Sequence, residues 1–170
     1  MILNQIDGFF PRLDQILPEI KKIPLYTNDE YLKKYKDHYF WPGQRSGNFA
    51  DSNPIFWNYI NELLVRKDLL KQGEWNISSQ IHLRLEQDST DDYIHKDECI
   101  YSILVYLSDT NYESGTYLYD ENKNVINDIK FVQNRLIMFS SKYNHSAYGH
   151  HGTDINNGRL TLNLFIRHET

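Results

Sequence analysis

The chain has 170 residues, of which 40% are hydrophobic and 24% charged, which predicts one globular domain and excludes a disordered protein. Its net charge of -5 provides no basic surface for a nucleic-acid backbone and argues against such a partner. The single cysteine, Cys99, and the absence of a signal-peptide pattern or of an apolar run of about 20 residues favour a soluble cytoplasmic protein without membrane contact.

Residues 1–75 are expected to form mainly helices that support the rest of the fold. Residues 1–11 are typical of a short strand or extended segment. Leucines and isoleucines at helical spacing predict a helix over residues 12–22, in which Pro18 must start or kink a turn. A second, weaker helix is predicted over residues 28–39.

The strongest helical pattern runs from Asn53 to about residue 72. Asn53 can cap this helix, Pro54 suits its first position and Gly73 suits its end. Its apolar stripe favours packing against a sheet. The aromatic loop before it, residues 40–47, is either a packed surface loop or the rim of a binding site, because loops on rigid scaffolds often carry binding residues.

After Trp75 apolar and polar residues alternate, which indicates half-buried strands. We predict strands at 81–86, 100–107, 116–119, 124–131, 135–139 and 160–167, with an acidic turn at 88–92. Short strands at this spacing favour a sandwich or barrel. The sequence therefore predicts a single domain over residues 1–170, mainly β with N-terminal helices, in which residues 76–170 form the β core.

His95 and Asp97 form a candidate metal-binding pair, because residues two apart in an extended segment share one side of the backbone. Two histidines and one carboxylate are the ligand set of non-heme Fe(II) oxygenases. Our choice for the third ligand is His145, which follows the strand at 135–139 and a polar turn. An H-x-D pair alone is common by chance. The ordered series of motifs that follows this pair strengthens its interpretation as a metal site.

Other histidines compete for the metal. His150 and His151 lie in a glycine-rich loop, where a surface role is the simpler interpretation. His82 is expected to pack in the core, although it could line a cavity. His38 and His168 have no ligand spacing with any neighbour.

The last predicted strand carries a polar face and an aliphatic face. Arg159, Thr161, Asn163 and Phe165 alternate with leucine and isoleucine, so the aliphatic face should pack under the helices and the polar face should line the interior. A buried cation without a partner is costly. A dicarboxylate would supply that partner, since guanidinium binds carboxylate bidentately, and the alternative is an internal Arg–Asp salt bridge.

Residues 82–167 resemble the iron(II)/2-oxoglutarate-dependent oxygenase superfamily, and are most similar to its prolyl-hydroxylase-like branch. The matching motifs are, in order, His95-Lys96-Asp97, Tyr101 to Ser108, Ser114-Gly115-Thr116, Arg135 to Phe139 before His145, and Arg159-Leu160-Thr161. Residues 40–46 also resemble a loop of small bacterial and viral members. The resemblance implies a double-stranded β-helix (jelly-roll) barrel.

The resemblance also implies the site. Iron would bind to His95, Asp97 and His145, and 2-oxoglutarate would chelate the metal with its far carboxylate on Arg159 and Thr161. Tyr106 would be a further donor to that carboxylate. The implied cofactors are Fe(II), 2-oxoglutarate as co-substrate and O2, with ascorbate as an optional addition.

The resemblance implies a hydroxylase of a peptidyl or small-molecule substrate, with succinate and CO2 as co-products. Asp97 favours hydroxylation over halogenation, because halogenating relatives lack that carboxylate. The interval of 14 positions from His145 to Arg159 is longer than usual, which keeps His150 as a rival ligand. The alternatives are a non-catalytic jelly-roll that binds a metal or ligand and, against the acidic net charge, a nucleic-acid demethylase. Candidates for the substrate pocket are Trp41, Arg45, His82 and Arg84.

Overall fold

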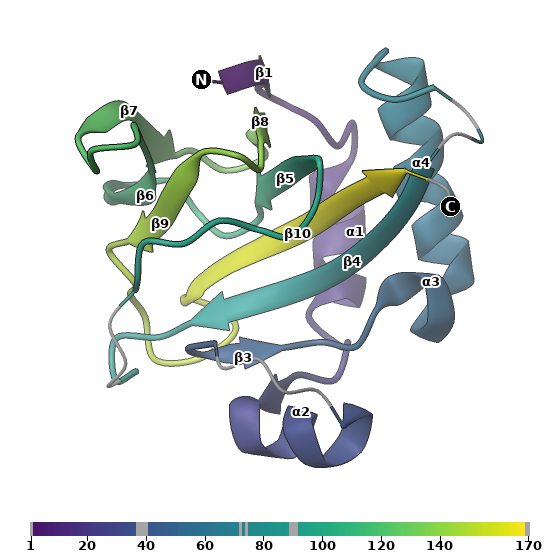
Figure 1. Cartoon of the computed structure of the whole chain (residues 1–170). Coiled ribbons are helices and arrows are strands. Elements are labelled where there is room, and N and C mark those ends of the chain that lie inside the picture. Colours follow the sequence, from purple (N-terminus) through teal and green to yellow (C-terminus); the bar gives the residue numbers. More distant parts are fainter. Residues whose placement is uncertain (1, 37–40, 72, 74, 89–91, 169–170) are drawn as a thin grey trace.

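The structure, a computed structural model that describes residues 2–36, 41–71, 73, 75–88 and 92–168, is built around two antiparallel sheets (Figure 1). Within these residues the larger sheet has seven strands, in the spatial order β1 (Ile2–Ile6), β8 (Leu136–Ser140), β5 (Tyr101–Tyr106), β10 (Arg159–His168), β4 (Trp75–Arg84), β3 (Gln44–Arg45) and β2 (Tyr26–Thr27). The smaller sheet has three, in the order β7 (Val125–Phe131), β6 (Asn111–Tyr119) and β9 (Asn144–Tyr148).

Helices cover one face of the larger sheet, and the smaller sheet faces the other. On the helical side, Leu160, Leu162, Leu164 and Ile166 of β10 pack in one hydrophobic cluster with residues of α1 (Leu13–Ile20) and α4 (Pro54–Arg66). On the opposite side, a second cluster joins the two sheets through Tyr106, Ile137, Phe139, Leu118, Ile129 and Phe131. The expected division of β10 into an aliphatic outer face and a polar inner face is what the structure shows.

The N-terminal helices are shorter than predicted. Helix α1 ends at Ile20, and Pro18 lies inside it. Helix α2 (Asn28–Tyr35) begins with a capping box between Thr27 and Glu30 and ends where Lys36 adopts a left-handed conformation with φ 53°. Residues 37–39, the rest of the predicted helix, lie outside the described residues.

Helix α4 begins where the sequence predicts, because the side chain of Asn53 accepts a hydrogen bond from the amide of Phe56 at 3.2 Å. The predicted end near residue 72 is wrong. The helix ends at Arg66, and Asp68 takes a positive φ of 56° that a helix cannot accommodate. Ile55 belongs to the apolar stripe that the sequence predicts on this helix, but it is 84% exposed, so the buried part of the stripe is narrower than predicted. None of the helices in the described part of the chain is long and apolar enough to cross a membrane.

All six predicted strands are present with shifted ends, and the prediction of a mainly β protein with N-terminal helices is confirmed. The pairings between these strands are antiparallel. Strand β4 begins at Trp75 and ends at Arg84, and the early segment forms β1, which pairs with β8. The sequence analysis missed the short helix α3 (Phe49–Ser52) and the strands β2, β3 and β9. Strand β9 has no alternation of apolar residues, and its position follows from pairing with β6.

Candidate metal centre

Backbone pairing brings His95 and His145 side by side. His95 lies in the segment between β4 and β5, and His145 lies in β9. The two residues form an isolated antiparallel bridge in which each amide donates to the other's carbonyl, at 3.0 and 2.9 Å. Residues directly opposite in such a pair project their side chains to the same face. The two imidazole rings accordingly lie with their centroids 4.3 Å apart.

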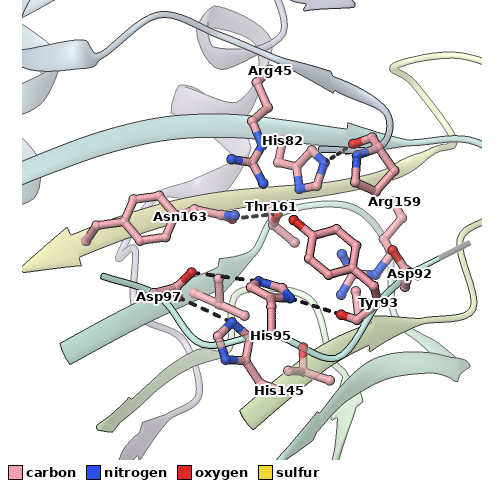
Figure 2. Close-up of a pocket in the computed structure, with 15 residues that line it drawn as sticks. Arg45, His82, Asp92, Tyr93, His95, Asp97, His145, Arg159, Thr161 and Asn163 are labelled. Atoms are coloured by element: carbon pink, nitrogen blue, oxygen red, sulfur yellow. Dashed lines mark hydrogen bonds and ion pairs between the residues drawn. The ribbon is translucent and has the colours of Figure 1, made fainter. Parts of the chain in front are cut away.

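Asp97 completes a three-residue cluster (Figure 2). Its carboxylate oxygens lie 3.7 Å from Nε2 of His95 and 3.3 Å from Nε2 of His145. One ligand atom from each of the three residues can be chosen so that all lie within 4.8 Å of one another. The structure therefore brings together two imidazole nitrogens and a carboxylate, a donor set that suits a divalent transition metal.

Backbone carbonyls orient both rings. Nδ1 of His95 lies 2.9 Å from the carbonyl oxygen of Tyr93, and Nδ1 of His145 lies 3.3 Å from that of Tyr143. Because a carbonyl only accepts, a neutral ring in either position would carry its proton on Nδ1. Nε2 of each ring, which faces Asp97, would then be the nitrogen available to a metal ion.

Asp97 is held ionised by its neighbours. Burial alone would raise the pKa of this carboxyl, but hydrogen bonds from His145 and Ser102 and the nearby imidazoles lower it to about 2. The Ser102 hydroxyl donates to Asp97 at 2.6 Å and also contacts the Ser141 hydroxyl at 2.8 Å. Burial, and then the proximity of His145, lower the pKa of His95. An ionised carboxylate is the form of Asp97 that metal binding requires.

A small pocket of about 70 Å³ lies between the cluster and the buried end of β10. We call it the inner pocket; Arg159, Thr161 and Thr116 line it together with His95, Asp97 and His145. Arg159 is only 2% exposed, and its guanidinium donates to the Ser114 hydroxyl at 3.2 Å and the Gly115 carbonyl at 2.9 Å. Burial lowers the pKa of Arg159. Among the residues that the structure describes, no carboxylate forms an ion pair with Arg159, so the Arg–Asp alternative is not seen.

The neighbouring polar groups are already hydrogen-bonded. The Thr161 hydroxyl donates to the side-chain oxygen of Asn163 at 2.8 Å. Tyr106 is fully buried, and its hydroxyl donates at 2.8 Å to Thr116, which itself lines the inner pocket. Because Tyr106 and Thr161 are opposite each other on β5 and β10, both side chains project toward the same side of the sheet.

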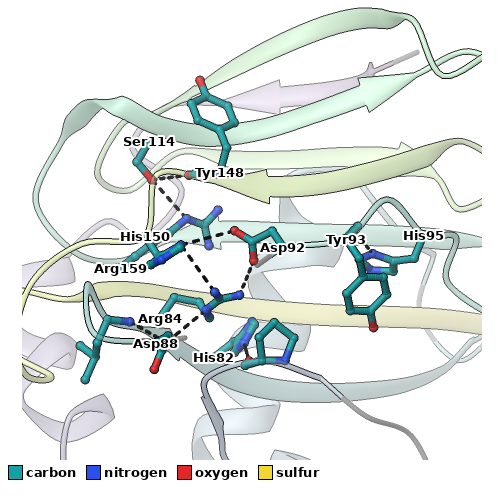
Figure 3. A network of polar contacts seen from close by, with 12 residues as sticks. His82, Arg84, Asp88, Asp92, Tyr93, His95, Ser114, Tyr148, His150 and Arg159 are labelled. Carbon is teal, nitrogen blue, oxygen red and sulfur yellow. Dashed lines mark hydrogen bonds and ion pairs between the residues drawn. The ribbon is translucent and has the colours of Figure 1, made fainter. Parts of the chain in front are cut away.

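Arg84 forms a second buried cationic site beside Arg159 (Figure 3). The two arginines are opposite each other on β4 and β10, and Arg84 is fully buried. Unlike Arg159, Arg84 is paired with carboxylates: Asp88 at 3.1 Å and Asp92 at shorter range. Nδ1 of His150 lies 3.7 Å from Asp92, so His150 belongs to this network rather than to the cluster of His95 and Asp97.

His82 lies in the inner pocket rather than in a purely apolar environment. Its Nε2 lies 2.7 Å from the carbonyl oxygen of Pro42, and burial keeps the pKa of this ring well below its usual value. The loop approaches β4 this closely because Gly43, with φ +80°, has no side chain; a Cβ there would lie 2.4 Å from the Leu83 carbonyl oxygen. His151 contacts the Gly149 carbonyl at 3.0 Å, and His38 lies outside the described residues.

The sequence analysis missed three residues of this site. Asp92 was treated as part of an acidic turn, although it precedes His95 by only three positions and lines the inner pocket. Tyr93 orients His95 through its backbone carbonyl, and its ring lies 4.7 Å from the His95 ring between centroids. A backbone contact of this kind leaves no signal in the sequence. Ser102 could have been found, since a small polar residue stands inside an otherwise apolar predicted strand.

No protein-family model matches this chain, and no curated sequence does. Solved structures do: a prolyl-4-hydroxylase from Pseudomonas putida has a TM-score of 0.62 and 16% identity, over 98% of this chain and 92% of that chain. An oxidoreductase of the 2OG-Fe(II) oxygenase family from Burkholderia pseudomallei has a TM-score of 0.66 and 14% identity, over 98% and 83%.

The alpha-ketoglutarate-dependent epimerase SnoN from nogalamycin biosynthesis is also similar, with a TM-score of 0.63 and 12% identity, over 98% of this chain and 76% of that chain. At these identities the likeness concerns the fold, and it extends over almost the whole chain. This chain therefore has the fold of the 2OG-Fe(II) oxygenases, prolyl-4-hydroxylases among them.

Proposed function

We propose that this chain is an Fe(II)- and 2-oxoglutarate-dependent dioxygenase that hydroxylates a peptidyl or small-molecule substrate. One observation carries the proposal: two imidazole nitrogens and an ionised carboxylate share a pocket with a buried guanidinium whose hydrogen-bond partners, among the described residues, are neutral. The shared fold supports it, and the similar oxidoreductase is named as a 2OG-Fe(II) oxygenase.

We infer that the two facing sheets form a double-stranded β-helix (jelly-roll) within a single domain over residues 1–170. The hydrophobic cluster that joins the sheets closes one part of the space between them. The inner pocket occupies another part, lined by β10 on one side and by β6 and β9 on the other. Such an arrangement holds His145, Arg159 and Thr161 on regular strands, which fixes their geometry, while His95 is tied to β9 by its bridge to His145.

In this proposal His95, Asp97 and His145 hold the iron, and Arg159 and Thr161 hold the far carboxylate of 2-oxoglutarate, with Tyr106 behind them. A carboxylate would give the buried Arg159 an anionic partner in addition to the Ser114 hydroxyl and the Gly115 carbonyl, through charge-assisted hydrogen bonds. Bound Fe(II) would supply the activation of O2, with one oxygen atom entering succinate as CO2 leaves 2-oxoglutarate and the other converting a substrate C–H bond to C–OH.

The reaction type needs a separate measurement from the class, because the same fold also serves an epimerase. The first test is anaerobic addition of Fe(II) and 2-oxoglutarate to the purified protein. We expect a visible charge-transfer band that is absent in His95→Ala and that needs much more 2-oxoglutarate in Arg159→Ala. Arg66→Gln, a charge change on the exposed surface of α4, is the matched control and should behave like the unchanged protein.

The outcomes separate the candidate functions. A band followed by consumption of O2 and formation of succinate in air supports a dioxygenase. Absence of the band in the unchanged protein, with metal bound, favours a non-catalytic metal- or ligand-binding protein. Hydroxylation and epimerisation then differ in whether the product of a given substrate gains 16 mass units, about the mass of one oxygen atom.

A further inference from the structure

A second and larger pocket opens beside the inner pocket. Its volume is about 450 Å³, within the range of small-molecule sites, and we call it the outer pocket. His95 and Asp97 line both pockets, so the candidate metal centre lies where the two meet. In the proposed function the inner pocket holds 2-oxoglutarate, which leaves the outer pocket for the substrate that is oxidised.

The outer pocket is lined by more basic than acidic residues, although the protein as a whole is acidic. Arg45, Lys96 and Arg167 line it, whereas its carboxylates are Glu98 and the candidate metal ligand Asp97. A bound divalent ion would make the balance more positive still. Since the whole chain carries a net charge of -5, this local excess is not an average property of the surface. A concave site with one sign of charge concentrates ligands of the opposite sign.

Arg45 is held in place by its surroundings. It lies on β3 directly opposite His82 on β4, and its guanidinium stacks 4.9 Å from the ring centroid of Trp41, a residue only 4% exposed. Figure 2 shows the Arg45 side chain directed into the site near Asn163. A stacked, planar guanidinium loses less conformational entropy on binding an oxyanion than a mobile lysine would.

Arg167 supplies a second guanidinium at the same pocket. It donates to the Ser78 hydroxyl at 3.0 Å and to the Glu98 carbonyl at 3.2 Å, and both acceptors are neutral. Among ion pairs between described residues, none involves Arg167. The wall of the pocket also includes the aromatic residues Trp41, Tyr93 and Phe165, beside the polar Ser78 and Gln80. Tyr93 and Phe165 reach the inner pocket as well. These side chains suit an apolar or planar body rather than a second charge.

We propose that the outer pocket binds the oxidised substrate as a small organic oxyanion, a carboxylate or a phosphate ester with an apolar or aromatic body. The oxyanion lies on Arg45 and Arg167, and the body lies against Tyr93 and Phe165, beside His95. This inference rests on the proposed function and adds the substrate class to it. Its distinguishing feature is that a neutral analogue of the same shape binds poorly.

The test uses the full chain loaded with Mn(II), which follows the same ligand preferences as Fe(II) with weaker binding and whose paramagnetism relaxes the NMR signals of nearby ligand protons. Saturating 2-oxoglutarate is added first, so that the acidic probes cannot bind to Arg159 in the inner pocket. The probes are 3-phenylpropanoate against 3-phenylpropanamide, and phenyl phosphate against phenol. The protein loaded with diamagnetic Zn(II) provides the background for each probe.

We expect at least one acid to be relaxed by Mn(II) and to bind at least about tenfold more tightly than its neutral partner, because charge-assisted hydrogen bonds to guanidinium are lost in the amide or phenol. Arg45→Gln and Arg167→Gln should each reduce this preference, and Arg45→Lys should retain part of it. Arg66→Gln, an equal charge change far from the pocket, should leave it unchanged. A preference for the phosphate over the carboxylate, or the reverse, identifies the head group.

The inference is overturned if Mn(II) binds but the acids and their neutral partners are relaxed equally, or if neither acid is relaxed. It is also overturned if the preference survives in both Arg45→Gln and Arg167→Gln. Failure of the proposed function has a different signature: the electron paramagnetic resonance spectrum then shows no Mn(II) bound to the protein. In that case the substrate assignment falls together with the metal centre.

Discussion

The two faces of strand β10 differ in almost every physical property. Toward the helices it presents Leu160, Leu162, Leu164 and Ile166, all fully buried in an apolar cluster. Toward the smaller sheet it presents Arg159, Thr161 and Asn163, which are nearly as buried but polar. Burying an aliphatic side chain contributes about 1.5–3 kcal/mol to folding, whereas burying a polar one costs free energy unless it is hydrogen-bonded.

This contrast separates stability from function within one strand. The outer face can be explained by folding alone, since its residues need no ligand. The inner face cannot, because a buried cation such as Arg159 is expensive and its partners are a hydroxyl and a carbonyl. Substitutions on the outer face should therefore change stability and spare the site, and substitutions around the inner pocket should do the reverse.

The strongest test of the inner face is His145→Ala. We expect the affinity for Fe(II) or Mn(II) to fall by more than the roughly 100-fold that loss of an outer hydrogen-bond partner costs, because a ligand atom itself is removed. Stability of the metal-free protein in urea should change by about 1 kcal/mol. His150→Ala is the matched control. Metal binding retained in His145→Ala and lost in His150→Ala would show that the ligand was misassigned.

The corresponding test of the outer face is Leu162→Ala. This side chain is fully buried, so truncation should cost about 2–5 kcal/mol of unfolding free energy, measured in urea. Metal affinity of the folded fraction should not change. Ile55→Ala, at an 84% exposed position of α4, should stay within about 0.5 kcal/mol. A loss of metal affinity in Leu162→Ala would show that the two faces are coupled.

A smaller effect is expected at Ser102, whose hydroxyl donates to Asp97 at 2.6 Å. Ser102→Ala should weaken metal binding about 10- to 100-fold, since the hydrogen bond that orients the carboxylate is lost. Ser79 is a buried serine opposite Leu164, on the other side of the same sheet. Ser79→Ala should leave metal affinity unchanged, and equal losses in both variants would contradict a specific role for Ser102.

The smallest expected effect is on the stability of the protein, and it comes from an ion pair at the edge of the larger sheet, away from both faces of β10. Asp7 pairs with Arg135 at 2.6 and 2.9 Å, and this hydrogen bond, opposed by slight burial, lowers the pKa of Asp7. A lowered folded pKa stabilises the protein above the ordinary value of 3.8, and that stabilisation is lost as the pH falls through the folded pKa.

Because the Asp7 side chain is 59% exposed, solvent screening limits the contribution of this ion pair to at most about 1 kcal/mol. Asp7→Asn should therefore be slightly less stable at neutral pH and equally stable once the carboxyl is protonated. Urea unfolding at both pH values checks this. A difference that persists at low pH would assign the effect to packing rather than to charge.

Local patterns predicted the strands well, and the three residues that they singled out as candidate ligands lie close together in the structure. The alternation around Thr161 identified both faces of β10, and the spacing of His95 and Asp97 placed two side chains on one side of the chain. These signals need only the two-residue period of an extended backbone. The end of α4 was predicted wrongly, because the positive φ of Asp68 has no compositional signal comparable to glycine.

The positions of several other residues depend on contacts between segments that are distant in the sequence, and local patterns did not predict them. The sequence analysis assigned no structure to most of β9, which lacks apolar alternation and forms a strand by pairing with β6. Arg45 was one of several candidates for a pocket, and only its position opposite His82 brings it beside the inner pocket. Asp88 and Asp92 of the acidic turn both pair with the buried Arg84, and of these two residues only Asp92 lines the inner pocket.

The reciprocal bridge between His95 and His145 joins two segments of the chain through the same residues that would grip the ion. Separating these segments breaks both backbone hydrogen bonds of the bridge and moves the two imidazole rings apart at the same time. An ion seated between the rings would therefore slow hydrogen–deuterium exchange at both amides by the same factor, since it binds only the joined form. Occupancy of the centre would thus be readable from two backbone protons, without any chromophore or turnover.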